Sequence, residues 1–270
     1  MYRIIACDLD ETLLSSDHSV CKRNLEAIEK ARKAGVKFVP ATGRGYHSVD
    51  PTLRQLGLMG EKGEYVISFN GGAITENFQN RLLHFEGISF DLARTLYERG
   101  LTYDVGIHIY TRDMVYASNI TPEDFESLSA RMKISRIPDD SLDFLRGTDI
   151  VKALYVNTDH EYLRGIEADY QDLASLMDIS YSSNRFIEFN RKGVNKGAGL
   201  LSLARLLGVR PEETIAIGDN FNDLSMIKAA GLGAGVRNSI EGLKKDCDYI
   251  TEASNDEGAV AEVIEKFILS

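Results

Sequence analysis

The stretch Tyr2-Arg3-Ile4-Ile5-Ala6-Cys7 runs directly into Asp8-Leu9-Asp10-Glu11-Thr12, and this junction decides the fold. A short apolar run of this kind is typical of a buried β-strand. Thr214-Ile215-Ala216-Ile217 meets Gly218-Asp219 in the same way, so two strands are expected to end at carboxylates. Carboxylates held together at strand ends repel one another, and burial adds to the cost. A hard divalent cation with oxygen ligands relieves both, so the pattern indicates a site for Mg²⁺.

Strand-like and helix-like segments alternate in the first and last thirds of the chain. Leu25, Ile28 and Ala31, for example, recur at helical spacing before Gly35. Such alternation predicts an α/β fold in which helices cover both faces of a Rossmann-like parallel sheet. The predicted strands cover residues 2–7, 36–40, 65–69, 214–217, 233–236 and 249–251, and the predicted helices cover 21–34, 48–56, 195–207, 223–230 and 258–268.

The middle of the chain has a different pattern, because its strand-like pieces follow one another with fewer crossovers. This order predicts an inserted α+β domain with an antiparallel sheet. We therefore expect a discontinuous core, 1–82 and 190–270, and an inserted domain, 83–189, with no Pro- or Gly-rich linker between them. The predicted strands of the insertion are 107–110, 115–117, 152–156 and 186–189, and its predicted helices are 91–100, 122–132 and 161–174.

Composition limits the classes of partner. The net charge of −10 over 270 residues disfavours binding to nucleic acid or to an anionic membrane. No apolar stretch approaches the roughly 20 residues of a membrane span, and the N-terminus lacks the layout of a secretion signal. Three widely spaced cysteines suit a reducing compartment. We expect a cytoplasmic protein with a small-molecule partner, as a monomer or a weak homo-oligomer.

In an open parallel sheet, ligands bind outside the carboxyl ends of the strands. The predicted strands end at Asp8, Thr42, Asn70 and Asp219, which gathers two carboxylates, a hydroxyl and an amide on one edge. Lys196, at the start of a predicted helix, adds a cation there. Such a set suits a dianionic phosphate, with Asp8 as the nucleophile. Asp10, two residues further on, could protonate a leaving oxygen.

Four segments in this order carry a resemblance to the haloacid dehalogenase (HAD) superfamily. Its DxDxT signature is similar to Asp8-Leu9-Asp10-Glu11-Thr12, and the later motifs are similar to Ala41-Thr42-Gly43-Arg44, Gly193-Val194-Asn195-Lys196-Gly197 and Gly218-Asp219-Asn220-Phe221-Asn222-Asp223. The long spacing between Thr42 and Lys196 resembles the Cof-type branch, in which a type IIB α/β cap is inserted there. The resemblance extends over essentially the whole chain.

The resemblance implies a role for each matching residue. Asp8 would attack phosphorus and form an aspartyl-phosphate, while Asp10 would protonate the leaving alcohol and then activate water. Mg²⁺ would be held by Asp8, by the backbone carbonyl of Asp10 and by Asp219. Asn222 and Asp223 would position Lys196 and the metal's waters. The residues expected to bind the substrate are Thr42, Gly43, Arg44, Asn70, Gly71, Lys196 and Asn222.

The sequence therefore predicts a Mg²⁺-dependent hydrolase of small phosphomonoesters, with sugar phosphates as the expected class. Two alternatives stay open: a phosphomutase or phosphotransferase on the same scaffold, and a catalytically silent sensor of a phosphorylated ligand. Single residues also have plainer interpretations. Thr42 fits a helix N-cap, Asn70-Gly71-Gly72 fits a simple turn, and Cys7 is expected in the core. Lys152 and Arg185 of the insertion either contact an anionic substrate or are solvated.

Overall fold

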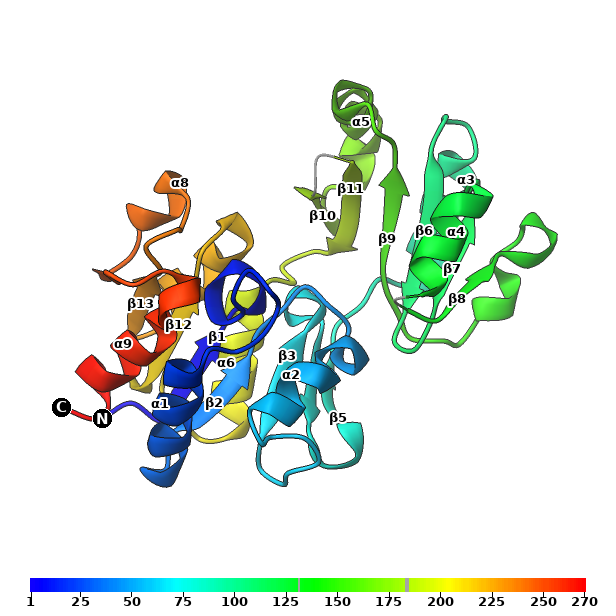
Figure 1. The fold of residues 1–270 in the computed structure, drawn as a ribbon. Helices are drawn as coiled ribbons and strands as arrows, with labels where there is room; N and C mark the ends of the chain where they lie inside the picture. Colours follow the sequence, from blue (N-terminus) through cyan, green and yellow to red (C-terminus); the bar gives the residue numbers. More distant parts are fainter. Residues whose placement is uncertain (131, 183–184) are drawn as a thin grey trace. The chain divides into compact units, whose positions relative to one another are not determined.

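The computed structural model describes residues 1–130, 132–182 and 185–270. The chain forms two compact units, of which unit 1 comprises Met1–Phe85 and Asn195–Ser270 and unit 2 comprises Glu86–Val194 (Figure 1). The predicted boundaries after residues 82 and 189 fall slightly earlier. The difference arises because residues 83–85 complete a hairpin of unit 1, while residues 190 and 191 complete a strand of unit 2.

Unit 1 contains a five-stranded parallel sheet in the order β14-β13-β12-β1-β2. Cys7 at the end of β1 pairs with Ile217 on one side and with Pro40 on the other. The residues that follow these strands therefore meet at one edge of the sheet. The strands are β1 (Ile4–Cys7), β2 (Lys37–Pro40), β12 (Thr214–Gly218), β13 (Leu232–Gly235) and β14 (Tyr249–Ile250).

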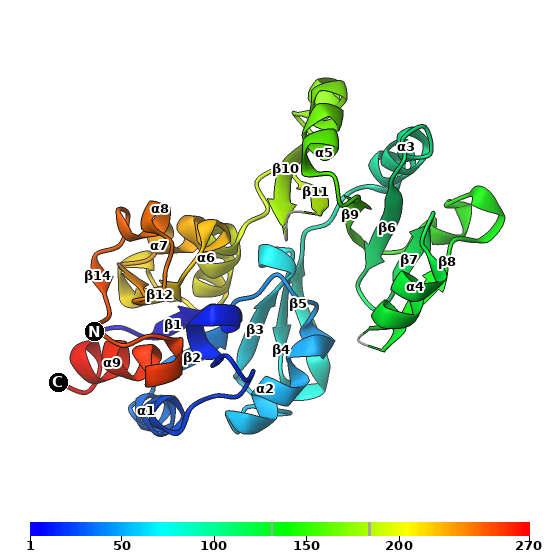
Figure 2. The same ribbon diagram turned by 45° about the horizontal axis from the view of Figure 1, so that its top comes forward.

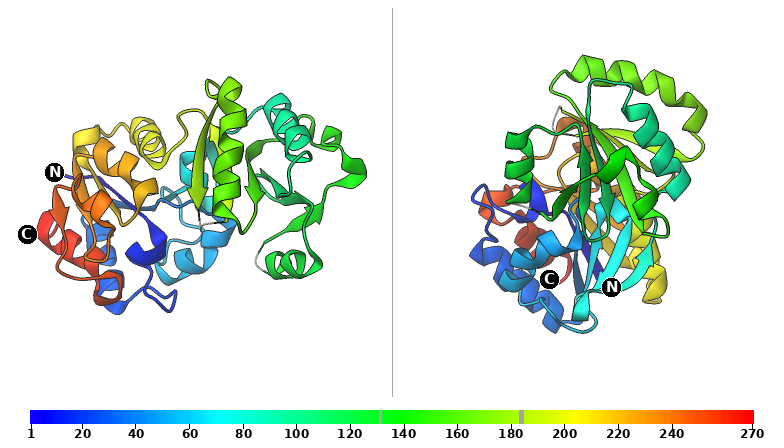
Figure 3. Two further views of the ribbon diagram at one scale, coloured as in Figure 1. Left: turned by 90° about the horizontal axis from the view of Figure 1, so that it is seen from above. Right: turned by 90° about the vertical axis from the view of Figure 1, so that its right-hand side faces the viewer.

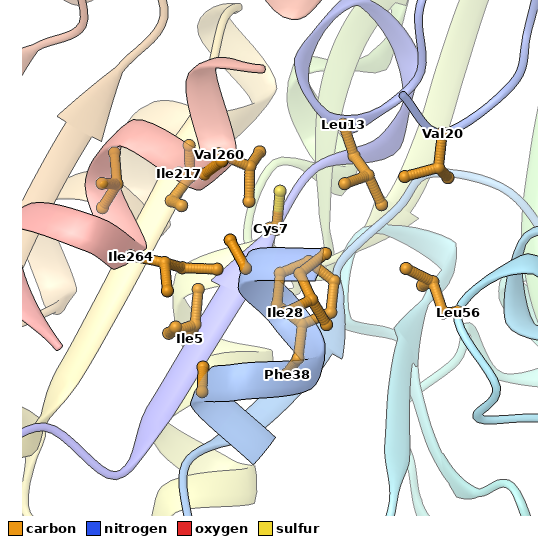
Figure 4. Close-up of a cluster of buried hydrophobic side chains, with 14 of the residues drawn as sticks. Ile5, Cys7, Leu13, Val20, Ile28, Phe38, Leu56, Ile217, Val260 and Ile264 are labelled. Atoms are coloured by element: carbon orange, nitrogen blue, oxygen red, sulfur yellow. The ribbon is translucent and has the colours of Figure 1, made fainter. Parts of the chain in front are cut away.

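Helices cover both faces of this sheet, as predicted. Ile5 and Cys7 point into a core with α1 and α9 (Figure 4), and these two helices lie side by side on that face (Figure 2). Ile4 and Ala6 point the other way, into a second core with α6 and α7. The helices of unit 1 are α1 (Lys22–Lys33), α2 (Asp50–Gln55), α6 (Lys196–Leu206), α7 (Leu224–Ala229), α8 (Glu241–Lys244) and α9 (Ala259–Phe267).

A three-stranded antiparallel sheet continues unit 1 beyond β2. It consists of β3 (Tyr65–Ser68), β4 (Ala73–Glu76) and β5 (Arg81–Phe85), and a parallel bridge joins Ala41, after β2, to Ile67. The sequence predicts β3 but not β4 and β5. Both are short, and Asn70-Gly71-Gly72 and the polar residues around Asn77 interrupt the apolar pattern before and after β4.

Unit 2 is built on a six-stranded sheet in the order β10-β11-β9-β6-β7-β8, antiparallel except for the pair β7–β8. Helices α3 and α5 pack their apolar sides on one face of this sheet. The strands are β6 (Gly106–Thr111), β7 (Val115–Ser118), β8 (Ile134–Arg136), β9 (Ile150–Val156), β10 (Met177–Ser182) and β11 (Phe186–Arg191), and the helices are α3 (Phe90–Gly100), α4 (Pro122–Ser129) and α5 (His160–Glu167).

The predictions for unit 2 need correction in three places. The helix expected over 161–174 is an α-helix only as far as Glu167, and a 3₁₀ helix, Ala168–Leu173, follows it. The strands β8 and β10 were not expected. The helix predicted over 122–132 ends at Ser129, and its position 131 lies outside the described residues.

Both ends of the chain belong to unit 1 (Figure 3). None of the helices in the described part of the chain has the length and apolarity that a membrane span requires. The cysteines Cys7, Cys21 and Cys247 are free thiols, and Cys7 is fully buried in the core, as its place in β1 predicts.

Candidate active site

Three carboxylates meet at the carboxyl edge of the parallel sheet of unit 1. Asp8 follows β1, Asp219 follows β12, and Asp223 closes a 3₁₀ helix, Phe221–Asp223, after that strand. One oxygen of each carboxylate lies within 4.8 Å of the other two, and all three residues are buried. The backbone N–H of Asp8 donates to the carbonyl of Ile217 at 2.9 Å, so the neighbouring strand β12 fixes the position of the Asp8 backbone. The sequence-based expectation had placed Asp8 and Asp219 at this edge.

Lys196 supplies a positively charged side chain to the site. Its side chain is fully buried, and its Nζ donates to Oδ1 of Asp8 and, at 2.6 Å, to Oδ1 of Asp223. Lys196 is the first residue of α6, where the Asn195 side chain caps the helix by accepting from the N–H of Ala198 at 2.9 Å. The cap fixes the start of α6 and therefore the direction in which Lys196 leaves the backbone.

The protonation behaviour of the cluster follows from its burial and its charges. Burial raises the pKa of Asp8 to about 8, although the charge of Lys196 acts in the opposite direction. Burial likewise raises the pKa of Asp219 to about 6, against a hydrogen bond from Thr12. For Lys196, burial alone would lower the pKa, but the charges of Asp8 and Asp223 outweigh it and raise the pKa above its usual value.

The charge and the ligand atoms of this cluster can be compared with those that the predicted Mg²⁺ requires. Three buried carboxylates share a single buried lysine, which leaves an excess of negative charge that one cation of charge +1 does not balance. Burial is the main cause of the raised pKa values of Asp8 and Asp219, and the negative charge of the neighbouring Asp223 raises both further. Carboxylate oxygens are the ligands that a hard divalent cation prefers, so the residues present fit Mg²⁺.

Asp223 organises the loop that carries Asp219. One of its oxygens accepts from Lys196, and the other accepts from the backbone N–H groups of Asp219 and Asn220 at 2.9 and 3.1 Å. The sequence assigned the positioning of Lys196 to both Asp223 and Asn222. The structure shows Asp223 in this position, whereas Asn222 is exposed and its role stays a prediction.

Thr12 is a site residue whose contact the sequence-based assignment missed. Its Oγ1 donates to Oδ1 of Asp219 at 2.7 Å, which links the loop after β1 to the loop after β12. Thr12 is fully buried. Its place as the final residue of the segment Asp8–Thr12 was the available signal, but only the fold shows that it meets Asp219.

Asp10 lies apart from the carboxylate cluster. Its side chain is about half exposed, at 49%, and forms a two-point ion pair with Arg44, whose Nε donates to Oδ2 of Asp10 at 2.9 Å. The sequence placed Arg44 in the substrate pocket but did not predict this pair. Asp10 and Arg44 therefore face each other at the edge of the site, beside the buried cluster.

Thr42, Gly43, Arg44 and Asn70 lie in two loops that are hydrogen-bonded to each other. The N–H of Asn70 donates to the carbonyl of Thr42 at 2.9 Å, and the buried Thr42 accepts at its Oγ1 from the N–H of Arg44 at 3.1 Å. The side chain of Asn70 lies against Gly43, where a Cβ would come within 3.2 Å of Oδ1. This Oδ1 is buried and has no hydrogen-bond partner within the described chain.

Gly71 has a structural position that the sequence did not reveal. It has a φ of +95°, and a Cβ built on it would lie 2.2 Å from the carbonyl oxygen of Asn195. Gly199 faces it from α6, where a Cβ would lie 2.9 Å from Cα of Gly71. These two glycines let the loop after β3 touch the first turn of α6, the turn that carries Lys196. Gly71 thus acts on the site through α6, and its predicted contact with substrate stays a prediction.

Comparison with known proteins agrees with this geometry. A family model of haloacid dehalogenase-like hydrolases matches residues 5–264. The chain is 30% identical to a putative phosphatase, YxeH, from Bacillus subtilis, with 100% of both proteins covered. It is 29% identical to a phosphoglycolate phosphatase from Methanobrevibacter smithii, with 98% of each protein covered.

Solved structures share the fold. A haloacid dehalogenase-like hydrolase from Bacteroides thetaiotaomicron has a TM-score of 0.84 and 32% identity, with 98% of this chain and 99% of that chain covered. A subclass IIB sugar phosphatase of the superfamily, at 20% identity and a TM-score of 0.81, has the same fold. The chain therefore belongs to the haloacid dehalogenase-like hydrolase family.

Proposed function

We propose that this enzyme hydrolyses small phosphomonoesters with the help of Mg²⁺, through an aspartyl-phosphate on Asp8. The observation that carries the proposal is the environment of the Asp8 carboxylate. Lys196 engages its Oδ1, and Asp219 and Asp223 surround it at the carboxyl edge of the sheet. A carboxylate held by one oxygen keeps the other oxygen for an attack on phosphorus.

The proposed reaction has two steps on this chain's own residues. In the first, an oxygen of Asp8 forms a bond to phosphorus while the bond from phosphorus to the ester oxygen breaks. Asp10 gives its proton to the leaving oxygen. In the second, Asp10 takes a proton from water, the water oxygen bonds to phosphorus, and Asp8 is released with inorganic phosphate. Bound Mg²⁺, held by Asp8, Asp219 and the backbone carbonyl of Asp10, would neutralise the charge that gathers around the phosphoryl group.

The remaining site residues bind and orient the phosphoryl group in this proposal. Lys196 supplies positive charge beside Asp8, and the Thr42 hydroxyl and the Gly43 backbone lie on the loop at the neighbouring strand end. Arg44 is paired with Asp10 in the structure, and its guanidinium group occupies both oxygens of that carboxylate. Proton donation by Asp10 therefore requires the pair to open, which frees Arg44 to bind the anionic substrate. Asn70, whose Oδ1 has no partner among the described residues, is the residue proposed to accept from a substrate hydroxyl.

Small phosphorylated metabolites, including sugar phosphates, are the substrate class that we propose. The relatives reported above are named as phosphatases, and one of them is named for a small substrate, phosphoglycolate. The inserted unit 2 has the place in the chain that the sequence predicts for a cap, and we propose that it serves as one. The cytosolic location and the monomeric or weakly oligomeric state stay predictions of the sequence.

A direct assay tests the proposal. The enzyme should release phosphate from p-nitrophenyl phosphate with Mg²⁺ and lose this activity reversibly when a chelator removes the metal. Asp8→Asn should abolish turnover, whereas Asp91→Asn, a control with a 79% exposed side chain, should retain it. Tight ligand binding without turnover by the wild type would favour a sensor. Transfer of phosphate to an added alcohol in place of water would favour a phosphotransferase.

A further inference from the structure

Three asparagines from separate elements hold the loop that carries Asp10. This loop, Leu9–Leu14, is called the Asp10 loop here. Nδ2 of Asn238 donates to the carbonyl of Glu11 at 2.8 Å, and Nδ2 of Asn255 donates to the carbonyl of Leu14 at 2.9 Å. A third and longer contact of 3.5 Å joins Asn24 to the carbonyl of Leu13. Both carbonyls that receive the short bonds are thus satisfied by side chains remote in the sequence.

The Asp10 loop has a backbone that needs such support. Within it, Asp10 has extended and Glu11 left-handed dihedral angles, so the backbone is not a regular helix. Glu11 has a φ of +58°, a region that a non-glycine residue occupies only when its surroundings stabilise it. The bond from Asn238 reaches the carbonyl of this strained residue, which directly follows Asp10.

The asparagines are themselves fixed by the C-terminal part of the chain. Oδ1 of Asn238 accepts from the N–H of Asn255 at 3.0 Å, and Oδ1 of Asn24 accepts from the N–H of Ala261 in α9 at 2.8 Å. The carboxylate of Asp256 also accepts two bonds from Ser16, one from the backbone N–H of Ser16 at 2.7 Å and one from the Ser16 hydroxyl at 2.8 Å. The loop after the first strand is therefore anchored to residues 238–261.

We propose that Asn238 and Asn255 are positioning residues that hold Asp10 where it can protonate the leaving group. The inference rests on the proposed function, because it assigns these residues to its proton-transfer step. In the described part of the chain, neither asparagine belongs to the carboxylate cluster, and neither is hydrogen-bonded to Lys196. Their effect reaches the chemistry through the backbone that follows Asp10, at the carbonyls of Glu11 and Leu14. An error of about 1 Å in the position of a catalytic group can cost about 100-fold in rate.

A pair of substrates that differ in leaving group separates this role from a general structural one. p-Nitrophenolate leaves as a stable anion, whereas phenol, with a pKa of about 10 like that of tyrosine, needs a proton as it leaves. The experiment compares kcat/KM for p-nitrophenyl phosphate and phenyl phosphate in Asn238→Ala and Asn255→Ala. We use kcat/KM because it reports the steps up to the transfer of phosphate to Asp8. The matched control is Asn157→Ala, which removes the same kind of bond, to the carbonyl of Asp104 at 2.7 Å in unit 2.

We expect kcat/KM for phenyl phosphate to fall about 10- to 100-fold in both variants, and for p-nitrophenyl phosphate to fall less than about threefold. Asn157→Ala should change neither value. Equal losses on both substrates, or no loss, would overturn the inference. Asn238 is exposed, so its variant keeps the test decisive if Asn255→Ala, with a side chain that is largely buried, fails to fold. A wild-type enzyme that hydrolyses neither ester would instead refute the proposed function.

Discussion

Lys196 carries its charge in a place that water does not reach. Its side chain is fully buried, and two carboxylates, Asp8 and Asp223, take up two of its three N–H donors. Taking the charges out of water costs free energy, and the mutual attraction repays it only while all partners stay in place. Removing one partner should therefore cost far more than the loss of an exposed ion pair.

Replacing Lys196 with methionine tests this statement. Lys196→Met leaves Asp8 and Asp223 buried without their cation, and we expect it to lower the free energy of unfolding by about 3–5 kcal/mol in metal-free buffer. Lys228→Met is the control, because Lys228 pairs with Asp246 at 3.0 Å but is 55% exposed, and its loss should cost less than about 1 kcal/mol. Urea unfolding at neutral pH measures the free energy of unfolding of both variants. Similar losses in the two variants would show that the buried ion pairs of Lys196 are no more costly to break than an exposed pair.

Single residues of the site differ in how far the sequence could predict their place. Asp8 and Asp219 each end a predicted strand, and parallel strands bring their carboxyl ends together, so their meeting needed no side-chain detail. The contact from Thr12 to Asp219 and the ion pair between Asp10 and Arg44 depend on loop conformation and rotamers. Sequence patterns do not determine these, and both contacts were missed.

At the scale of elements, the first turn of α6 is held by its contact with the loop after β3. Gly71 and Gly199 lie so close that neither has room for a Cβ. This contact fixes the position of the first turn of α6 and therefore the position of Lys196 in the site. Gly197 in the same turn lies equally close to the backbone of Ser225, at the start of α7. Glycine is required here by close approach, and at Gly71 also by a φ of +95°.

Gly71→Ala should therefore reduce both stability and activity. The matched control is Gly35→Ala, because Gly35 has a similar φ of +87° but no atom within 4 Å of the point that a Cβ would occupy. We expect Gly71→Ala to lower the free energy of unfolding by about 1–3 kcal/mol more than Gly35→Ala. It should also lower kcat, since α6 must shift and Lys196 moves with it. Equal stability losses with unchanged kcat would contradict this view of the contact.

The elements themselves were largely predictable from apolar periodicity. The five strands of the parallel sheet and most of the helices were expected at nearly their observed positions, because each combines an apolar run with a clear end signal such as Gly35 or Gly208. The strands β4, β5, β8 and β10 were not predicted from the sequence. They are short or alternate weakly, and their pairing is decided by contacts with distant strands rather than by local sequence.

At the scale of the whole molecule, each of the two units has its own buried core. In unit 2, His108 on β6 is 4% exposed, and burial lowers its pKa to about 4. Asp124 opposes this shift and Arg185 supports it. A histidine with a lowered pKa stays neutral in the folded state, whereas in the unfolded chain it takes up a proton below about pH 6.5. Protonation therefore favours unfolding of unit 2 as the pH falls from 6.5 towards 4.

His108→Asn should weaken this pH dependence. From the shift of pKa, His108 costs unit 2 about 2 kcal/mol of stability between neutral pH and pH 5. Amide hydrogen exchange in β6 at pH 7.5 and pH 5 measures the difference for wild type and variant. Between pH 7.5 and pH 5, we expect the wild type to lose about 2 kcal/mol more stability than the variant. The other titrating groups are common to both proteins, so parallel losses would show that His108 is not responsible.

In the proposed reaction, Asp8 becomes phosphorylated during turnover. A rapid acid quench of the enzyme with substrate and Mg²⁺, followed by peptide mass spectrometry, detects this phosphate. We expect transient phosphate on the peptide that contains Asp8, located at that residue by borohydride reduction, and no such phosphate in Asp8→Asn. Phosphate on another residue, or steady turnover by Asp8→Asn, would contradict it.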